Sequence, residues 1–341
     1  MSADFRNLPK IELHCHLDAS VRVATVADLG RQIGLTLPEP LAPALVAPQI
    51  CLDLADYLLR IDLALEVMQH RDQLVRIARE FVEDLALDGV IYGEVRFAPR
   101  LHLRQGLSLQ EVVDAVDEGL RQGQQEFGVA TGLILCCLRH EPPAHSVEIA
   151  KLALANRDKV CALDLAGDEA RFSGAPHAEA FALARAEGLR RTVHAGEAAG
   201  ADSIREALEL LGAERIGHGV RIEESGELEE AVKDAGVALE MCPLSNVQTR
   251  ATSALANHPI DRLLRNGVRV TVSTDARTVS ATTVSAEFDR LAQTFGWGTE
   301  EFWRCQHHAA DAAFVSPQAR LALASKLSEA GTTGAASAGL R

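Results

Sequence analysis

Apolar residues gather in eight short runs along the chain. Each run has the length of a β-strand, and most are rich in β-branched residues, a composition typical of strands. The predicted strands are Ile11–Leu17, Val90–Pro99, Val129–Arg139, Cys161–Gly167, Arg190–Glu197, Arg215–Gly219, Val237–Pro243 and Arg269–Ala276.

Helical periodicity fills most of the intervals between these runs. In Leu54–Leu65 the apolar residues recur three or four positions apart, which places them on one face of a helix. The same spacing predicts helices over Leu74–Leu87, Leu109–Gln122, Ala178–Glu187, Ile204–Leu211 and Leu228–Ala235. Strands that alternate with helices form parallel sheets with right-handed crossovers. Eight such units predict an α/β protein whose sheet closes into a (β/α)8 or TIM barrel, rather than an open doubly wound sheet.

The chain of 341 residues is within the range of one barrel domain, and it contains neither an internal repeat nor a dividing linker. We predict a single domain over residues 1–328. Residues 22–70 form a long insertion after the first strand, which we expect to be a helical cap over the barrel mouth. The small, polar segment 329–341 predicts a disordered tail.

Charge and cysteine content indicate which binding partners and which cellular compartment to expect. The formal net charge is −14 and the basic residues do not cluster, so we expect no nucleic-acid partner. No secretory signal or membrane-spanning stretch is evident, and we expect no membrane partner. The seven cysteines are scattered and odd in number, which indicates free thiols in a reducing, cytoplasmic setting. The sequence leaves a monomer and a homo-oligomer both open.

Potential metal ligands stand where several predicted strands end. In a barrel, the carboxyl ends of the strands face the active-site mouth. His14 and His16 are two positions apart and therefore point to the same side of their strand. Two further strands end in His194 and Asp275. Three imidazoles and one carboxylate suit Zn²⁺ with a position left for water. We predict one zinc ion per chain, held by these four residues.

Two further residues at the ends of predicted strands are candidates for proton transfer. Zn²⁺ lowers the pKa of bound water to about 7, which supplies hydroxide at neutral pH. His218, at the end of the sixth run, could take the proton of that water and orient it. Glu197 could protonate the substrate atom that accumulates negative charge. A solvated loop carboxylate is the alternative for Glu197, but its position just after His194 favours catalysis.

Two other metal-enzyme patterns are excluded. The segment His140–His145 resembles a zincin motif, but its histidines are five positions apart, and Pro142 and Pro143 are incompatible with the required helix. The H-x-E and P-C-x-x-C signature of the small cytidine-deaminase fold is absent.

Eight motifs in register carry a resemblance to a known family. From about residue 8 to about residue 315, the chain contains, in order, LPKIELHCHLDAS, DGVIYGEVRFAPRLH, LILCCLRH, LDLAGDE, RTVHAGEAAG, RIGHG, EMCPLSN and VTVSTDAR. In these motifs it resembles the adenosine deaminase family of the metal-dependent amidohydrolase superfamily.

The resemblance implies a (β/α)8 hydrolase that converts adenosine, and 2′-deoxyadenosine, to inosine and ammonia on zinc, with the four ligands already named. It implies that Glu197 delivers a proton to purine N1 and that His218 positions and deprotonates the attacking water. Gly167 would offer its backbone N–H to purine N3, and Asp18 would bind the ribose 5′-hydroxyl. Leu54–Leu65 would form an apolar lid over the sugar.

Two positions depart from the family pattern. Where the family commonly has a second Asp that binds purine N7, and a bacterial subgroup has Asn, this chain has Ala276. Losing that contact typically costs about 1–3 kcal/mol, or roughly one to two decades in kcat/KM, unless water or Arg277 replaces it. Ala19 replaces a usual Gly, which adds a methyl group that we expect near the ribose. Both departures concern the identity of the substrate rather than the reaction.

Several alternatives therefore stay open. One is deamination of another N6-aminopurine, either adenine or a 6-amino-deoxyfutalosine-like nucleoside with a larger 5′ substituent; Asp18, which needs a donor, favours a free 5′-hydroxyl. A second is ester or amide hydrolysis, against which Glu197 argues. A third is a catalytically silent nucleoside-binding protein, against which the retention of all the metal-ligand and proton-transfer candidates argues.

Overall fold

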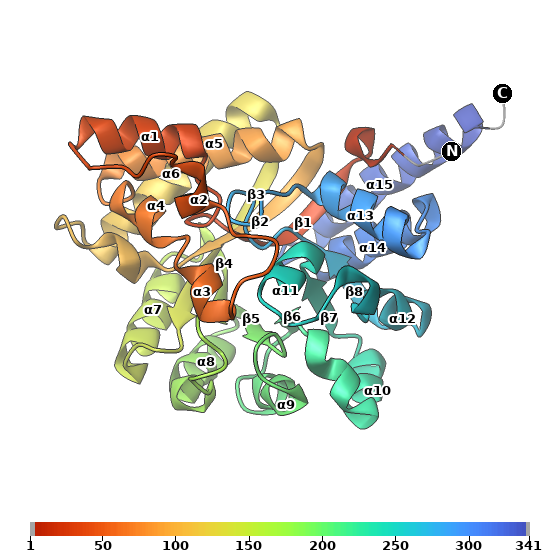
Figure 1. Cartoon of the computed structure of the whole chain (residues 1–341). Helices are drawn as coiled ribbons and strands as arrows, with labels where there is room; N and C mark the ends of the chain where they lie inside the picture. The colour runs from red at the N-terminus through yellow and green to blue at the C-terminus, as the bar shows by residue number, and fades with distance from the viewer. Residues whose placement is uncertain (1–3, 339–341) are drawn as a thin grey trace.

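The computed structural model describes residues 4–338, and in this part of the chain eight parallel strands form one barrel, ringed by helices (Figure 1). Neighbours in the barrel follow the order of the chain, from β1 to β8. This confirms the predicted (β/α)8 fold. The strands are β1 Lys10–His16, β2 Val90–Phe97, β3 Ala130–Leu138, β4 Val160–Ala166, β5 Arg190–Ala195, β6 Arg215–His218, β7 Ala238–Met241 and β8 Arg269–Val272.

The α-helices follow or flank these strands. Their bounds are α1 Val23–Gln32, α2 Ala42–Leu45, α3 Leu54–Leu58, α4 Asp62–Glu66, α5 Arg71–Leu87, α6 Leu109–Phe127, α7 Pro143–Ala155, α8 Ala178–Ala186, α9 Ala201–Glu209, α10 Gly226–Ala235, α11 Pro243–Gln248, α12 Ile260–Arg265, α13 Val284–Phe295, α14 Thr299–Ala312 and α15 Pro317–Ala338. Their ends follow local sequence signals. Ser108 and Glu111 form a capping box at the start of α6, and Gly128, at φ 73°, ends it. The main hydrophobic core lies between the strands and the helices.

The barrel closes between β1 and β8 through residues that the prediction assigned to the eighth strand. β8 ends at Val272 rather than Ala276, because the chain then leaves the regular ladder. The backbone N–H of Asp275 donates to His14 O (3.0 Å), and His16 N–H donates to Asp275 O (2.7 Å). Asp275 has a φ of 63°, in the left-handed region that non-glycine residues adopt rarely and mostly at functional sites.

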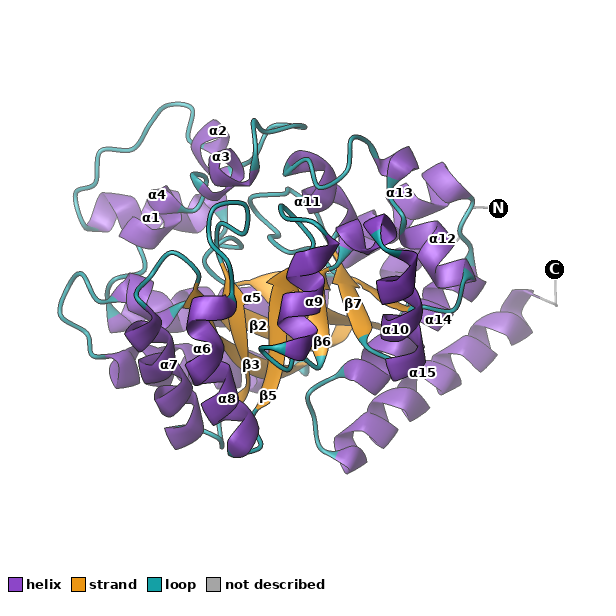
Figure 2. Cartoon of the chain, turned by 90° about the horizontal axis from the view of Figure 1, so that it is seen from below, coloured by secondary structure: helices purple, strands orange, loops and turns teal. Residues whose placement is uncertain are grey.

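The insertion between β1 and β2 carries α1–α4, which Figure 2 shows grouped on one side of the strands. The continuous helix predicted over Leu54–Leu65 is wrong, because the chain breaks between α3 and α4. Arg60 N–H donates to Tyr57 O (3.1 Å) and Ile61 N–H to Leu58 O (3.0 Å). These tight, 3₁₀-type turns interrupt the α-helical pattern. They allow Leu58 and Ile61 to line the cavities described below.

The C-terminal segment differs from the predicted tail. α15 continues through Ala338, because residues 329–338 are rich in alanine, the best helix former, and lack proline. Leu323 and Leu327 anchor the helix in a cluster with Ile11 of β1. Residues 339–341 of that prediction lie outside the described residues.

Over residues 4–338, no helix combines the length and the apolar character that crossing a bilayer requires. All seven cysteines lie in this range and are free, as predicted.

Candidate active site

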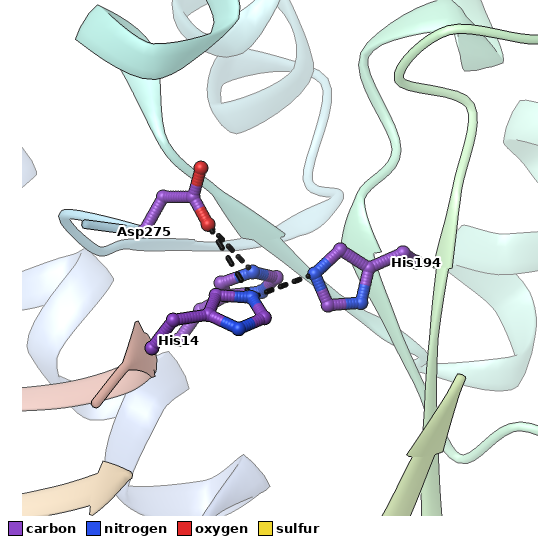
Figure 3. A group of neighbouring side chains, drawn as sticks. His14, His194 and Asp275 are labelled. Carbon is purple, nitrogen blue, oxygen red and sulfur yellow. Dashed lines mark hydrogen bonds and ion pairs between the residues drawn. The ribbon is translucent and has the colours of Figure 1, made fainter. Parts of the chain in front are cut away.

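The four predicted metal ligands converge at the carboxyl ends of the strands. Their donor atoms all lie within 4.8 Å of one another. His16 Nε2 lies 3.0 Å from His194 Nε2, and Asp275 Oδ1 lies 3.3 Å from His14 Nε2 and 3.6 Å from His16 Nε2. Figure 3 shows His14 of β1, His194 of β5 and Asp275, which follows β8, directed toward one another. The tertiary structure therefore brings together residues that are as far as 261 positions apart in the chain.

The donor arrangement fits a tetrahedral ion. Donors about 2.0–2.1 Å from a tetrahedral Zn²⁺ are roughly 3.3–3.4 Å apart, and the observed separations bracket this value. His14 Nε2 is buried and, among the described residues, has no hydrogen-bond partner. Two imidazole nitrogens 3.0 Å apart are also typical of ligands that share an ion. The residues present thus fit a divalent metal.

Buried carboxylates hold the far sides of the histidine rings. His14 Nδ1 lies 2.8 Å from Glu240 Oε2, and His194 Nδ1 lies 3.1 Å from Asp164 Oδ2. Arg96 joins the two carboxylates, at 2.7 Å from Glu240 and 3.0 Å from Asp164. Such partners fix the orientation of metal-binding imidazoles and raise their basicity. Burial alone would raise the pKa of Glu240, but the guanidinium groups of Arg96 and Arg215, together with His14, hold it well below the usual range, so Glu240 stays ionised.

Sequence reasoning missed these supporting residues, although a signal was present. Asp164 and Glu240 are single charges inside apolar strands, and Arg96 shares its strand with Glu94 alone. Fully buried charges are rare unless they are paired. Ser245 was missed as well. Its hydroxyl donates to Asp275 Oδ2 (2.6 Å) and leaves the other carboxylate oxygen facing the histidines.

Glu197 and His218 lie together beside the metal ligands. Glu197 Oε2 is 3.6 Å from His218 Nε2, and Glu197 Oε1 is buried without a partner among the described residues. Burial, then the charges of Asp275 and Glu169, raise the pKa of Glu197 well above its ordinary value. This shift favours the protonated form of the carboxyl group, which is the form that a general acid uses. Burial, together with the neighbouring His14, lowers the pKa of His218 well below its ordinary value.

His218 is oriented by Asn246. The Asn246 side-chain oxygen accepts from the backbone N–H of Cys242 (3.3 Å), so its amide nitrogen faces His218 Nδ1 (3.0 Å). A donor at Nδ1 places the hydrogen of the neutral ring on Nε2. His218 thus presents an N–H toward Glu197 and the metal ligands. This geometry is suited to orienting an oxygen atom and is poorly suited to the proton acceptance that the sequence suggested.

The loop that carries Glu197 is held by Glu169, which the sequence did not single out. The Glu169 carboxylate accepts from the backbone N–H groups of residues 196–199, at 2.6–3.1 Å, and from the Ser203 hydroxyl (2.5 Å). Two signals in the sequence were available: Glu169 is the last residue of the LDLAGDE motif, and it follows β4 closely.

Two adjoining cavities share His16 in their walls, and His194 and Asp275 line the inner one. The inner cavity, of about 380 Å³, contains Glu197, His218 and Ala276 in its walls, together with α3 residues of the cap. The outer cavity contains Asp18, and Gly167 borders both. Burial raises the pKa of Asp18 to about 7, and its Oδ1 has no partner among the described residues. Gly167 has a φ of 100°, which favours glycine.

The two departures from the family pattern both lie in the inner cavity. Ala276 and Ala19 share an apolar cluster with Tyr57. Ala19 thus lies beside Ala276, among the inner-cavity residues, rather than among the residues of the outer cavity with Asp18. Arg277 cannot replace the missing contact, because its guanidinium is turned away, toward Glu12 and Asp88.

Comparisons with known proteins identify the family of the chain. A profile of the family described as adenosine deaminase matches residues 9–330. An adenosine deaminase from Clostridium acetobutylicum is 40% identical over 325 residues, which cover 94% of this chain and 97% of the relative.

Solved structures are similar over most of both chains. An adenine deaminase from Arthrobacter aurescens is 28% identical with a TM-score of 0.89, covering 94% of this chain and 98% of that one. An amidohydrolase from Burkholderia ambifaria with bound Zn is 25% identical (TM-score 0.88; 97% and 94%). An N6-methyl-AMP deaminase from Arabidopsis thaliana is 28% identical (TM-score 0.86; 96% and 98%). With its fold, its convergent site and these relatives, the chain belongs to the adenosine deaminase family.

Proposed function

We propose that this protein deaminates adenosine and 2′-deoxyadenosine hydrolytically, releasing ammonia. The observation that carries the proposal is the pairing of a four-donor metal site with a buried carboxyl group whose pKa is raised. Glu197 and three of the ligands, His16, His194 and Asp275, line the same cavity, and Glu197 Oε1 has no partner within residues 4–338. One substrate can therefore meet the metal and the acid together. Membership of the adenosine deaminase family supports the same reaction.

The metal that we propose is one Zn²⁺ ion per chain, held by His14, His16, His194 and Asp275. Three nitrogen donors and one oxygen donor are a combination that zinc accepts readily, and a similar amidohydrolase contains bound Zn. When bound, zinc activates water for nucleophilic attack at neutral pH. Glu240 and Asp164 keep the His14 and His194 rings in place for it.

Two side chains carry out proton donation and orientation of the attacking oxygen. Glu197 donates its proton to purine N1, which makes C6 more electrophilic. The Nε2–H of His218 orients the attacking oxygen, with Asn246 holding the ring. The oxygen of water replaces the amino group at C6. One hydrogen of that water leaves with ammonia, and the other restores the proton on Glu197. The cap residues of the inner cavity exclude bulk water from this exchange.

A nucleoside fits the outer cavity better than a nucleotide or a free base. Asp18 and Asp62 both line it, and the guanidinium of Arg104, which also lines it, is paired with Glu66. A 5′-phosphate would therefore lie near two carboxyl groups, whereas a 5′-hydroxyl can donate to Asp18 Oδ1. Adenine would leave that buried oxygen without a partner, and a 5′-substituted nucleoside would offer no donor. The Gly167 backbone N–H is proposed to bind purine N3.

The test is a panel of substrates incubated with zinc-loaded protein, in which the ultraviolet change on deamination measures the rate. Adenosine and 2′-deoxyadenosine should be turned over with a higher kcat/KM than AMP, adenine or a 5′-substituted adenosine. Preference for one of the last three would reject the proposed substrate while retaining the reaction. A metal-loaded protein that binds nucleosides but deaminates none of them would reject the reaction itself.

A further inference from the structure

The inner cavity contains one hydroxyl group that the proposed mechanism does not use. Apart from the metal ligands, His218 and Glu197, Tyr57 is the only described side chain in its walls with a polar atom. Tyr57 belongs to α3 of the cap, and its side chain is buried against Ala276 and Ala19. A polar atom in so apolar a wall calls for a hydrogen-bonding partner.

The hydroxyl lies on the β8 side of the cavity. Tyr57 Oη is 2.7 Å from Ser280 Oγ, and Ser280 N–H in turn donates to Ala276 O (2.9 Å). Glu197 approaches from the loop after β5, and β6 and β7 separate these two strands in the barrel. A ring bound in the cavity would thus meet Glu197 and Tyr57 on different sides.

The chemistry of the purine matches this placement. If N1 faces Glu197 and C6 faces the metal ligands, N7 lies on the other side of C6. N7 can only accept a hydrogen bond, Ala276 has no donor to offer, and Arg277 is turned away. Tyr57 and Ser280 have two hydroxyl hydrogens, and their mutual bond uses one. The Tyr57 hydroxyl also contacts Ser245, whose own hydrogen is donated to Asp275, so the second hydrogen can turn from Ser245 to a ligand. Burial, then the charge of Asp275, raise the pKa of Tyr57 well above its ordinary value, so the phenol keeps its hydrogen.

We propose that Tyr57, supported by Ser280, determines base specificity by donating a hydrogen bond to purine N7. The inference rests on the proposed deaminase function and deepens it. The competing explanation is that the Tyr57–Ser280 hydrogen bond only fastens α3 to the loop after β8. The two explanations differ in one respect: a fastening role acts on every substrate equally, whereas recognition of N7 disappears when N7 is replaced by carbon.

The experiment compares adenosine with 7-deazaadenosine in the zinc-loaded wild type and in Tyr57→Phe. We expect the kcat/KM preference for adenosine to fall about tenfold in Tyr57→Phe, the worth of one hydrogen bond. The ratio cancels differences in intrinsic reactivity and in the fraction of active protein. Tyr92→Phe, which changes the chain's other tyrosine, is the matched control: it is buried, its hydroxyl donates to Glu94 (3.0 Å), and it should leave the ratio unchanged.

Binding provides a second measurement that needs no turnover. Calorimetric affinities for inosine and 7-deazainosine should show the same loss of preference in Tyr57→Phe. If the wild type deaminates no adenine nucleoside, the proposed function fails, and the binding ratio still decides the role of Tyr57. An equal preference in wild type and Tyr57→Phe, by either measurement, would overturn the inference and leave Tyr57 as a fastening residue.

Discussion

Replacing Glu169 by Gln should damage both stability and catalysis, although Glu169 is outside the proposed set of metal and proton-transfer residues. The carboxylate accepts four backbone N–H groups and one hydroxyl. Whichever way the amide turns, its NH₂ group faces at least one buried N–H of residues 196–199. One orphaned donor costs about 1–3 kcal/mol, and loss of the ionised acceptor adds to this, for a total of about 2–4 kcal/mol. Urea unfolding of the variant would measure it.

The catalytic effect follows from Glu197, which the same loop carries. A small displacement of this acid should lower kcat by about 10–100-fold. The negative charge of Glu169 also helps to raise the pKa of Glu197. Because Glu197 acts in its protonated form, activity falls as the pH rises through that pKa. Removing the charge should lower the pKa, so the alkaline limb of the pH–rate profile moves to lower pH.

A matched control is available on α9. Glu206 accepts from Gly174 N–H (2.6 Å) and from the Ser173 hydroxyl (2.7 Å), in a loop away from Glu197. Glu206→Gln should leave the alkaline limb in place. An unchanged urea midpoint together with an unmoved alkaline limb in Glu169→Gln would refute the reasoning.

Three further substitutions test the site. Glu197→Gln should keep one metal ion per chain and lose about 10²–10⁴-fold in kcat, and loss of metal in that variant would make Glu197 a ligand instead. Glu240→Gln removes the charged partner of His14 and should weaken metal affinity about 10–100-fold in chelator competition; unchanged affinity would contradict the supporting role. Ala276→Asp should raise kcat/KM for adenosine more in the Tyr57→Phe background than in the wild type, and no gain in either would indicate a base shifted away from residue 276.

Much of the site was predictable because a (β/α)8 barrel places the ends of all its strands at one edge, and the strands themselves are recognised from local sequence patterns. Apolar runs that alternate with helical periodicity predicted the order of the strands, and parallel strands place all their carboxyl ends at one mouth. His14, His194 and His218 therefore had to lie close together once the fold was identified.

Other features depended on how distant segments pack. Glu240 meets His14 across 226 positions and Tyr57 meets Ser280 across 223, and no periodicity specifies such pairs. The break between α3 and α4 was equally invisible, because the apolar spacing of Leu54–Leu65 continues through it.

The sequence by itself thus determined the barrel, and from local spacing and residue types at strand ends it predicted the candidate ligand set. The expected reaction class came from the motifs that resemble a known family. Only the tertiary structure decided which atoms face one another. It turned Arg277 away from the cavity, gave Glu197 a loop anchored by Glu169, and placed the Tyr57 hydroxyl beside Ala276. The physical reason is that hydrogen bonds and burial depend on distances of a few ångströms between side chains, and closure of the barrel sets those distances.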